Sequence, residues 1–120
     1  MGVEPAGSAR YYSKRLPGVR VHIGPLETAG LPDSSVDVVN FRHVIEHLRA
    51  PTEILLEARR VLRSGGVVVV STPNFDSLVQ WLSRLTGRNW RFYEEDHLWY
   101  FTPSSLRRCL EGCGFRVIHM

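Results

Sequence analysis

The sequence has little lysine, little cysteine and no long apolar run. Lys14 is the only lysine, so the formal charge of +3 comes from scattered arginines, which argues against the basic patch that nucleic acid requires. No apolar run approaches the ~18 residues of a membrane span, and the amino terminus lacks a secretory signal core, so we expect a cytoplasmic protein without membrane contact. Cys109 and Cys113 share a helical stripe with Leu106 and Leu110, which favours burial over a disulfide.

A strand, a helix and a second strand follow one another in the middle of the chain. Residues Val36 to Asn40 predict a buried strand, and Pro51 suits the first turn of an amphipathic helix. Gly65 and Gly66 are predicted to end that helix. Residues Val67 to Ser71 are apolar on both faces, as in a strand covered by helices on both sides. This order favours parallel pairing in a single α/β domain.

Shorter elements are predicted on either side of this unit. We expect Gly2 to Glu4 to end a strand, and we expect a helix from Asp76 to Gly87 and another that begins at Thr102 and Pro103. The remaining predicted elements are a helix over residues 6–16, a strand from Val19 to Ile23, a loop over residues 24–35 and a last strand from Phe115 to His119.

Polar residues gather after the strand that ends at Asn40. In parallel sheets, ligands bind at the carboxyl ends of the strands, so His43, Glu46 and His47 are candidates for a site there, with His43 or His47 as the base. The same residues match the inverted zinc-peptidase motif His-x-x-Glu-His, so a metal-dependent hydrolase is one alternative. That motif requires a long helix, which the preceding strand and Pro51 argue against.

Five segments, in this order, resemble class I S-adenosylmethionine-dependent methyltransferases. They are Leu31 to Val39, His43 to Leu48, Leu62 to Gly66, Pro73 with Asn74, and His97 to Pro103. The resemblance implies that residues 1–120 are a partial methyltransferase domain, truncated at the amino terminus. Its fold would be a partial Rossmann-like parallel sheet with flanking helices, without the first strand and the glycine-rich loop. The implied cofactor is S-adenosylmethionine, and the implied reaction is methyl transfer to a small-molecule acceptor.

The resemblance also implies a set of cofactor-binding residues. Glu4 matches the acid that binds the ribose hydroxyls of the cofactor, and Asn40 lies at the carboxyl end of its strand. The family often has an acid for the adenine amino group where this chain has Pro25, which leaves the amide of Leu26 and the side chain of Glu27 to substitute. The glycine-rich turn that would precede Glu4 is lacking, so we expect residues 1–120 alone to bind S-adenosylmethionine weakly.

A metal-dependent subset of the family, which includes quinone-biosynthesis O-methyltransferases, resembles the chain more closely around one site. Mapped by position, the implied ligands of a divalent metal are His43, Glu46, His47 and His97. His43 replaces the usual acid, which shifts the preference towards zinc. We expect Glu46, His47 and His97 to converge to within about 5 Å, close enough to bind a metal after small rotations. The alternative is that these residues only cap a helix or line a cleft.

A non-catalytic role remains as an alternative to an enzyme. The strand from Val36 to Asn40 would lack its family neighbour, and an unpaired apolar strand recruits other chains. We therefore expect either pairing with the strand before Glu4 or a homodimer through exposed strand edges. The chain would then be a fragment or subunit that completes its sheet with a second chain. Trp81, Trp90 and Trp99 are expected in the core, with a substrate lid over residues 90–101 as the minority interpretation.

Overall fold

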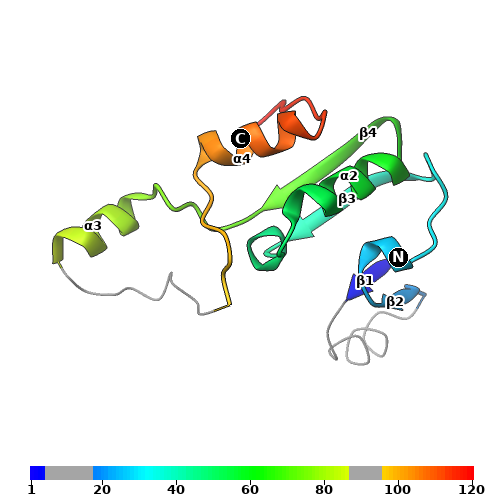
Figure 1. Cartoon of the computed structure of the whole chain (residues 1–120), viewed down its shortest axis with the longest axis horizontal. Helices are drawn as coiled ribbons and strands as arrows, with labels where there is room; N and C mark the ends of the chain where they lie inside the picture. Colours follow the sequence, from blue (N-terminus) through cyan, green and yellow to red (C-terminus); the bar gives the residue numbers. More distant parts are fainter. Residues whose placement is uncertain (5–17, 87–95) are drawn as a thin grey trace.

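The computed structural model describes residues 1–4, 18–86 and 96–120, which form an α/β fold with parallel strands (Figure 1). The predicted helix over residues 6–16 lies outside this part of the chain. The elements in chain order are β1 (Gly2–Glu4), β2 (Val21–Ile23), η1 (Leu26–Thr28), β3 (Val36–Arg42), η2 (Ile45–His47), α2 (Pro51–Val61), β4 (Leu62–Ser71), α3 (Leu78–Thr86) and α4 (Pro103–Gly112).

The predicted strand–helix–strand unit is present as β3, α2 and β4. The two strands are parallel, and Pro51 occupies the first turn of the crossover helix. The prediction that the glycines end α2 is wrong, because β4 already begins at Leu62. Gly65 and Gly66 lie inside β4, at the irregularity where the pairing partner changes from Leu62 to Val67. Gly65 has φ +77°, and a Cβ on Gly66 would approach the Arg63 carbonyl oxygen to 2.9 Å, so this bulge favours glycine at both positions.

The core covers one face of the β3–β4 pair. Alternate strand residues pack there against α2 and α4, among them Val39, Phe41, Val68 and Val70, with Ile54, Leu55, Ala58, Leu106 and Leu110 from the helices. On the other face Val38, Val67 and Val69 are 57%, 42% and 46% exposed. The prediction that helices cover both faces of β4 is therefore wrong for the described part of the chain.

Helix α4 carries its cap and its cysteines as the sequence indicates. The Thr102 side chain accepts a hydrogen bond from the Ser105 amide in a capping box. Cys109 and Cys113 are free thiols, and Cys113 is buried against the core. Burial raises the pKa of both thiols. The predicted last strand from Phe115 to His119 is absent because no strand among the described residues pairs with it, although Phe115 still packs against the core.

Strands β1 and β2 form a second, separate parallel pair. Glu4 is opposite Ile23 in the register, so the chain beyond β2 continues at the same end as Glu4. The buried side chain of Leu26 joins η1 to the main core. The two pairs are separate sheets, so the first of the two expected alternatives, pairing of β3 with the strand before Glu4, is wrong, and the homodimer stays a prediction. Among the described strands, β3 pairs only with β4.

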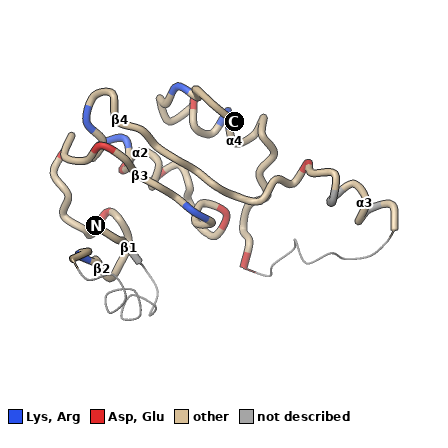
Figure 2. The backbone as a smooth tube through the Cα atoms, turned by 180° about the vertical axis from the view of Figure 1, so that it is seen from behind, with Lys and Arg blue, Asp and Glu red and all other residues tan. Residues whose placement is uncertain are grey.

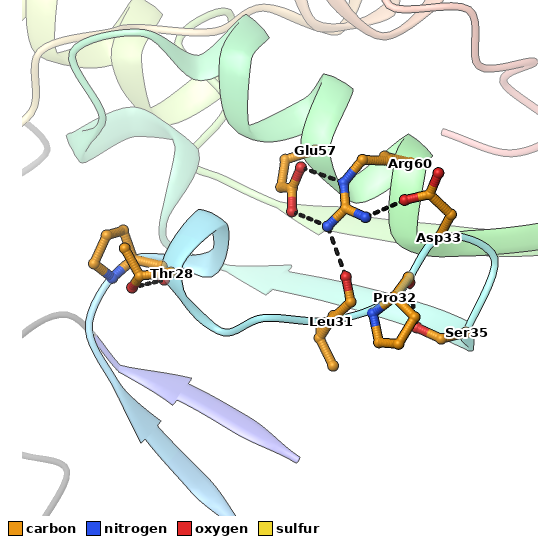
Figure 3. Close-up of polar contacts among 8 residues, drawn as sticks. Thr28, Leu31, Pro32, Asp33, Ser35, Glu57 and Arg60 are labelled. Carbon is orange, nitrogen blue, oxygen red and sulfur yellow. Dashed lines mark hydrogen bonds and ion pairs between the residues drawn. The ribbon is translucent and has the colours of Figure 1, made fainter.

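An arginine in α2 holds the loop that leads into β3 (Figure 3). Arg60 donates to both carboxylate oxygens of Glu57 at 2.8 and 2.6 Å, to Asp33, and to the Leu31 carbonyl oxygen at 2.8 Å. The guanidinium lowers the pKa of Glu57 by hydrogen bonding and charge. The amide of Ser34 returns a hydrogen bond to the Arg60 carbonyl oxygen at 2.9 Å. These contacts fix the start of β3 relative to α2.

Charged residues are spread over the described elements. Figure 2 shows arginines on β3, β4 and α4. The absence of a nucleic-acid partner stays a prediction. Helix α3 extends away from the rest of the fold (Figure 1), and its Leu78, Trp81, Leu82 and Leu85 are exposed. Within the described residues, no helix is long and apolar enough to cross a membrane.

Candidate functional site

A strained turn opens the site at the carboxyl end of β3. The amide of His43 donates to the Ser71 carbonyl oxygen at 2.8 Å, which extends the strand ladder by one residue. His43 then adopts φ +50°, in the left-handed region that non-glycine residues rarely occupy. Such backbone strain costs about 1 kcal/mol or more and is concentrated at functional sites. The turn directs the chain into η2, which holds Glu46 and His47.

A segment about fifty residues later is hydrogen-bonded to η2. The Glu46 carbonyl oxygen accepts from the amides of Leu98 at 2.8 Å and Trp99 at 3.1 Å. The Trp99 indole N–H donates to the Leu48 carbonyl oxygen at 2.8 Å. These three bonds hold residues 97–99 beside η2, so that His97 lies against His47, with ring centroids 4.7 Å apart.

The Glu46 side chain is buried without a hydrogen-bond partner. The residue is 0% exposed, and neither carboxylate oxygen has a hydrogen-bond partner among the described residues. His43 Nδ1 lies 3.3 Å from Glu46 Oε1, close enough for a charge interaction, but the pair is not a hydrogen bond. A buried polar group left unpaired costs about 1–3 kcal/mol, and more when it is charged. Such an arrangement indicates that the carboxylate is kept for a ligand or a proton.

Three ligand atoms meet at this position, one each from Glu46, His47 and His97. All three lie within 4.8 Å of one another, so the expected convergence is confirmed. We call these residues the Glu46 group. His47 Nδ1 lies 3.0 Å from the Asp96 carbonyl oxygen. Because a carbonyl only accepts, Nδ1 carries the proton and the lone pair of neutral His47 is on Nε2, where it can bind a metal or accept a proton.

His43 lies beside the Glu46 group rather than in it. Its side chain is 55% exposed, and its nearest charged partner is Glu46. The four metal ligands expected from the sequence therefore separate into three convergent residues and one neighbour. The inverted zinc-peptidase motif is not formed, because His43 follows a strand and only Ile45–His47 is helical, as a single 3₁₀ turn.

The expected cofactor residues lie on three elements. Glu4 is the last residue of β1, and Leu26 and Glu27 lie in η1 just after β2, so all three lie at the carboxyl ends of adjacent parallel strands. The Leu26 side chain is buried and Glu27 is exposed, which leaves only main-chain atoms of Leu26 for a ligand. Asn40 is exposed in β3, on the face opposite the core.

Several aromatic residues were misjudged or missed in the sequence. Trp99 and Trp81, the latter on α3, are exposed and not part of the core. Trp90 lies outside the described residues. Phe75 and Tyr100 have ring centroids 5.2 Å apart. The aromatic density around His97 was the available signal for Tyr100, whereas nothing singled out Phe75. Asn74 caps a turn, because its Oδ1 accepts from the Asp76 amide at 2.9 Å.

Comparison with known proteins identifies the family. A family model described as a methyltransferase domain matches residues 4–120. The chain belongs to this methyltransferase family. A solved S-adenosylmethionine-dependent methyltransferase from Thermotoga maritima, described as a possible histamine N-methyltransferase, superposes with a TM-score of 0.79 at 26% identity, over 98% of this chain and 55% of that chain. The fold of the methyltransferase chain is accordingly a partial Rossmann-like one.

Two curated relatives are also methyltransferases. A probable S-adenosylmethionine-dependent methyltransferase from Mycolicibacterium smegmatis is 52% identical over 60 residues, which cover 50% of this chain and 23% of that protein. The ubiquinone biosynthesis O-methyltransferase of Aeromonas salmonicida is 29% identical over 128 residues, which cover 100% of this chain and 53% of that protein. The methyltransferase chain therefore spans about half or less of the length of these relatives.

Proposed function

We propose that this methyltransferase chain forms the acceptor side of an S-adenosylmethionine-dependent methyltransferase that acts on a small molecule in the cytoplasm. The single observation that carries the proposal is the Glu46 group: a buried carboxylate and two imidazoles meet at the carboxyl edge of a parallel sheet of the methyltransferase fold. Ligands of such sheets bind at that edge. Family membership supports S-adenosylmethionine as the cofactor, which the description of the Mycolicibacterium smegmatis relative also names.

The proposed chemistry requires alignment and a proton acceptor. The acceptor atom attacks the methyl carbon, the carbon–sulfur bond of the sulfonium breaks, and S-adenosylhomocysteine leaves. Displacement at a sulfonium needs mainly positioning and exclusion of water. The acceptor's proton passes to His47 Nε2. This nitrogen carries the lone pair, because the contact with the Asp96 carbonyl oxygen keeps the proton on Nδ1. His43, which is more exposed, is the alternative base.

The cofactor is proposed to lie along the carboxyl ends of β1 and β2. There Glu4 would bind the ribose hydroxyls, because a carboxylate offers several acceptors to a diol. The main chain of Leu26 and the exposed Glu27 side chain would contact the adenine, and Asn40 is proposed as a further contact from β3.

The residues of the Glu46 group also fit a divalent metal. A carboxylate with two histidines is a known zinc ligand set, and the unpaired Glu46 oxygens have no competing donor among the described residues. Two ligands with bonds of ~2.1 Å can lie at most about 4.2 Å apart, so the spacing of up to 4.8 Å requires small side-chain rotations. When bound, the metal would occupy the lone pair of His47 Nε2 and would polarise an acceptor hydroxyl, so that His43 instead of His47 would take the proton.

The test is a titration of residues 1–120 with S-adenosylhomocysteine, followed by amide chemical shifts. We expect weak binding in fast exchange, with shifts at Glu4, Leu26, Glu27 and Asn40. Glu27→Gln should weaken binding, whereas Glu53→Gln, an exposed acid of α2, should leave it unchanged. Shifts confined to other elements would contradict the proposed cofactor position. A micromolar dissociation constant would contradict the view that the chain holds only part of the cofactor site.

A non-catalytic subunit is the second candidate, and the uncovered sheet favours it. Val38, Val67 and Val69 expose an apolar face, and β3 has one edge without a partner among the described strands. Such surfaces recruit a second chain, and a homodimer is one form of this. Light scattering after size-exclusion chromatography tests this role. A dimer would favour it, provided that Val67→Lys dissociates the dimer and Ile118→Lys does not. A stable monomer would oppose it.

A further inference from the structure

A pair of side chains closes the turn that follows β2. Thr28, the last residue of η1, donates its hydroxyl proton to the Pro25 carbonyl oxygen at 2.9 Å (Figure 3), and its amide donates to the same oxygen at 3.1 Å. The Thr28 hydroxyl oxygen also lies 2.9 Å from Nε2 of His22, the middle residue of β2. We call His22 and Thr28 the η1 bridge, because they join the end of η1 to the strand before it.

The two hydrogen bonds of the Thr28 hydroxyl determine which nitrogen of His22 carries the proton. A hydroxyl has one proton to donate, and the Pro25 carbonyl oxygen can only accept. Both bonds therefore form at once only when His22 Nε2 is protonated and donates to the Thr28 oxygen. The order of donation runs from the imidazole through the hydroxyl to the main chain of the turn, so loss of either side chain breaks it.

Gly24 leaves the space that the η1 bridge occupies. Its φ is +139°, a conformation that residues with a side chain rarely adopt. A Cβ at this position would lie 3.0 Å from the Thr28 hydroxyl oxygen and 3.1 Å from His22 Nε2. Conformation and space therefore both favour glycine here, and the glycine allows the two side chains to lie within hydrogen-bond distance.

Glu27 lies within the turn that the bridge closes. On one side of it the Leu26 side chain is buried in the core, and on the other side Thr28 is held by the bridge. The Glu27 side chain itself is exposed. We propose that the η1 bridge positions the Glu27 carboxylate to select adenine as the base of the cofactor. The inference rests on the proposed function, in which Glu27 contacts the adenine.

His22 and Thr28 act as positioning residues, because their effect on the base passes through Glu27. The adenine amino group is a hydrogen-bond donor, and an ionised carboxylate only accepts. A carboxylate on a turn that is already ordered loses less conformational freedom when it binds. A turn without the bridge keeps the main-chain bonds of η1, so it stays folded but holds Glu27 less firmly.

The experiment compares two ligands that differ only in the amino group of the base. They are S-adenosylhomocysteine and its analogue with unsubstituted purine in place of adenine, each titrated against residues 1–120 and followed by amide chemical shifts. We expect S-adenosylhomocysteine to bind about threefold to tenfold more tightly, the usual value of one hydrogen bond. Thr28→Val, which removes the hydroxyl at similar volume, should bring this ratio close to one, and Thr28→Ser should keep it. The control Thr52→Val, at an exposed position of α2, should keep the ratio of the wild type.

Two further variants separate positioning from a structural role. His22→Phe keeps a ring but removes its donor, so it should lower the ratio as Thr28→Val does, and circular dichroism checks that each variant is folded. In Glu27→Ala, which lacks the carboxylate, Thr28→Val should change the ratio no further, because the bridge acts through Glu27. A structural role alone would weaken the binding of both ligands equally and leave the ratio unchanged.

Equal affinities of the wild type for the two ligands, or a ratio that survives both Thr28→Val and His22→Phe, would overturn the inference. Either result leaves the proposed function standing, provided that S-adenosylhomocysteine still shifts the amides of η1. Shifts confined to other elements would instead refute the proposed cofactor position, and the inference with it.

Discussion

Replacing the buried Glu46 by leucine should stabilise the metal-free chain, which is the opposite of what a core substitution usually does. The side chain is 0% exposed, and its two oxygens have no hydrogen-bond partner among the described residues. Leucine removes both polar atoms at similar volume, whereas the hydrogen bonds to the Glu46 carbonyl oxygen come from the main-chain amides of Leu98 and Trp99 and remain. Removal of an unpaired buried polar group should gain about 1–3 kcal/mol of unfolding free energy.

This gain has a measurable size in thermal unfolding. A chain of 120 residues has an unfolding entropy of about 0.25 kcal/mol/K, so Glu46→Leu should raise Tm by about 4–12 °C without metal. Zinc at about a hundred times its dissociation constant should stabilise the wild type by about 2.7 kcal/mol, or about 11 °C, and should have no such effect on the variant. Calorimetry with and without zinc measures both effects.

The matched control is Glu57→Leu, which should lower Tm. Glu57 accepts two hydrogen bonds from Arg60, so the same substitution there removes satisfied contacts instead of unpaired ones. If Glu46→Leu lowered Tm as a cavity-forming core variant does, His43 or another group would have to stabilise the carboxylate in the native state. The argument that Glu46 is kept at a cost would then be wrong.

Three further predictions concern other contacts. Trp99→Phe loses the hydrogen bond to the Leu48 carbonyl oxygen and should cost about 1 kcal/mol; zinc affinity measured by calorimetry should fall several-fold, while Trp81→Phe, on the exposed face of α3, should leave it unchanged. Because the pKa of Glu57 is lower in the folded than in the unfolded chain, where it is near 4.5, its ion pair stabilises the fold at pH values above 4.5. Tm should therefore fall as the pH drops through the folded pKa, and it should fall less in Glu57→Gln. Equal pH profiles of Tm in the two proteins would contradict the ion pair. Cys109 and Cys113, whose pKa values burial raises, should react slowly with a thiol reagent at pH 8 and quickly in denaturant; fast reaction of both in the native chain would contradict their packing.

Local patterns predicted the central unit of the fold, and non-local contacts account for the errors. The spacing of apolar residues after Pro51 and the valine run both act within a few residues, so α2 and β4 could be predicted. The function of Gly65 and Gly66 depends on the register with β3, which no local pattern shows. The segment from Phe115 to His119 has the composition of a strand, but a strand also needs a partner, and none of the described strands pairs with it.

The site was predicted in a similarly uneven way. His97 was placed with Glu46 and His47 through the resemblance to known methyltransferases, not from spacing, and the structure confirms the placement. The contacts that hold it there involve main-chain groups of Glu46, Leu48 and Leu98, and main-chain hydrogen bonds carry no sequence signature. The burial of the Glu46 carboxylate was likewise unpredictable, because burial depends on tertiary packing, which no local pattern shows. The roles of His43, Glu4, Leu26, Glu27 and Asn40 stay predictions.

Methyl transfer by a polypeptide that contains residues 1–120 tests the central claim most directly. Transfer from radiolabelled S-adenosylmethionine to a panel of phenols, amines and alcohols should be detectable. His47→Gln should reduce kcat by about 10²–10⁴-fold, the usual contribution of a general base, with little change in Tm. His119→Gln, which alters an exposed histidine far along the chain, should leave kcat unchanged. Transfer that proceeds equally well in both variants would contradict the claim that the Glu46 group is the working site.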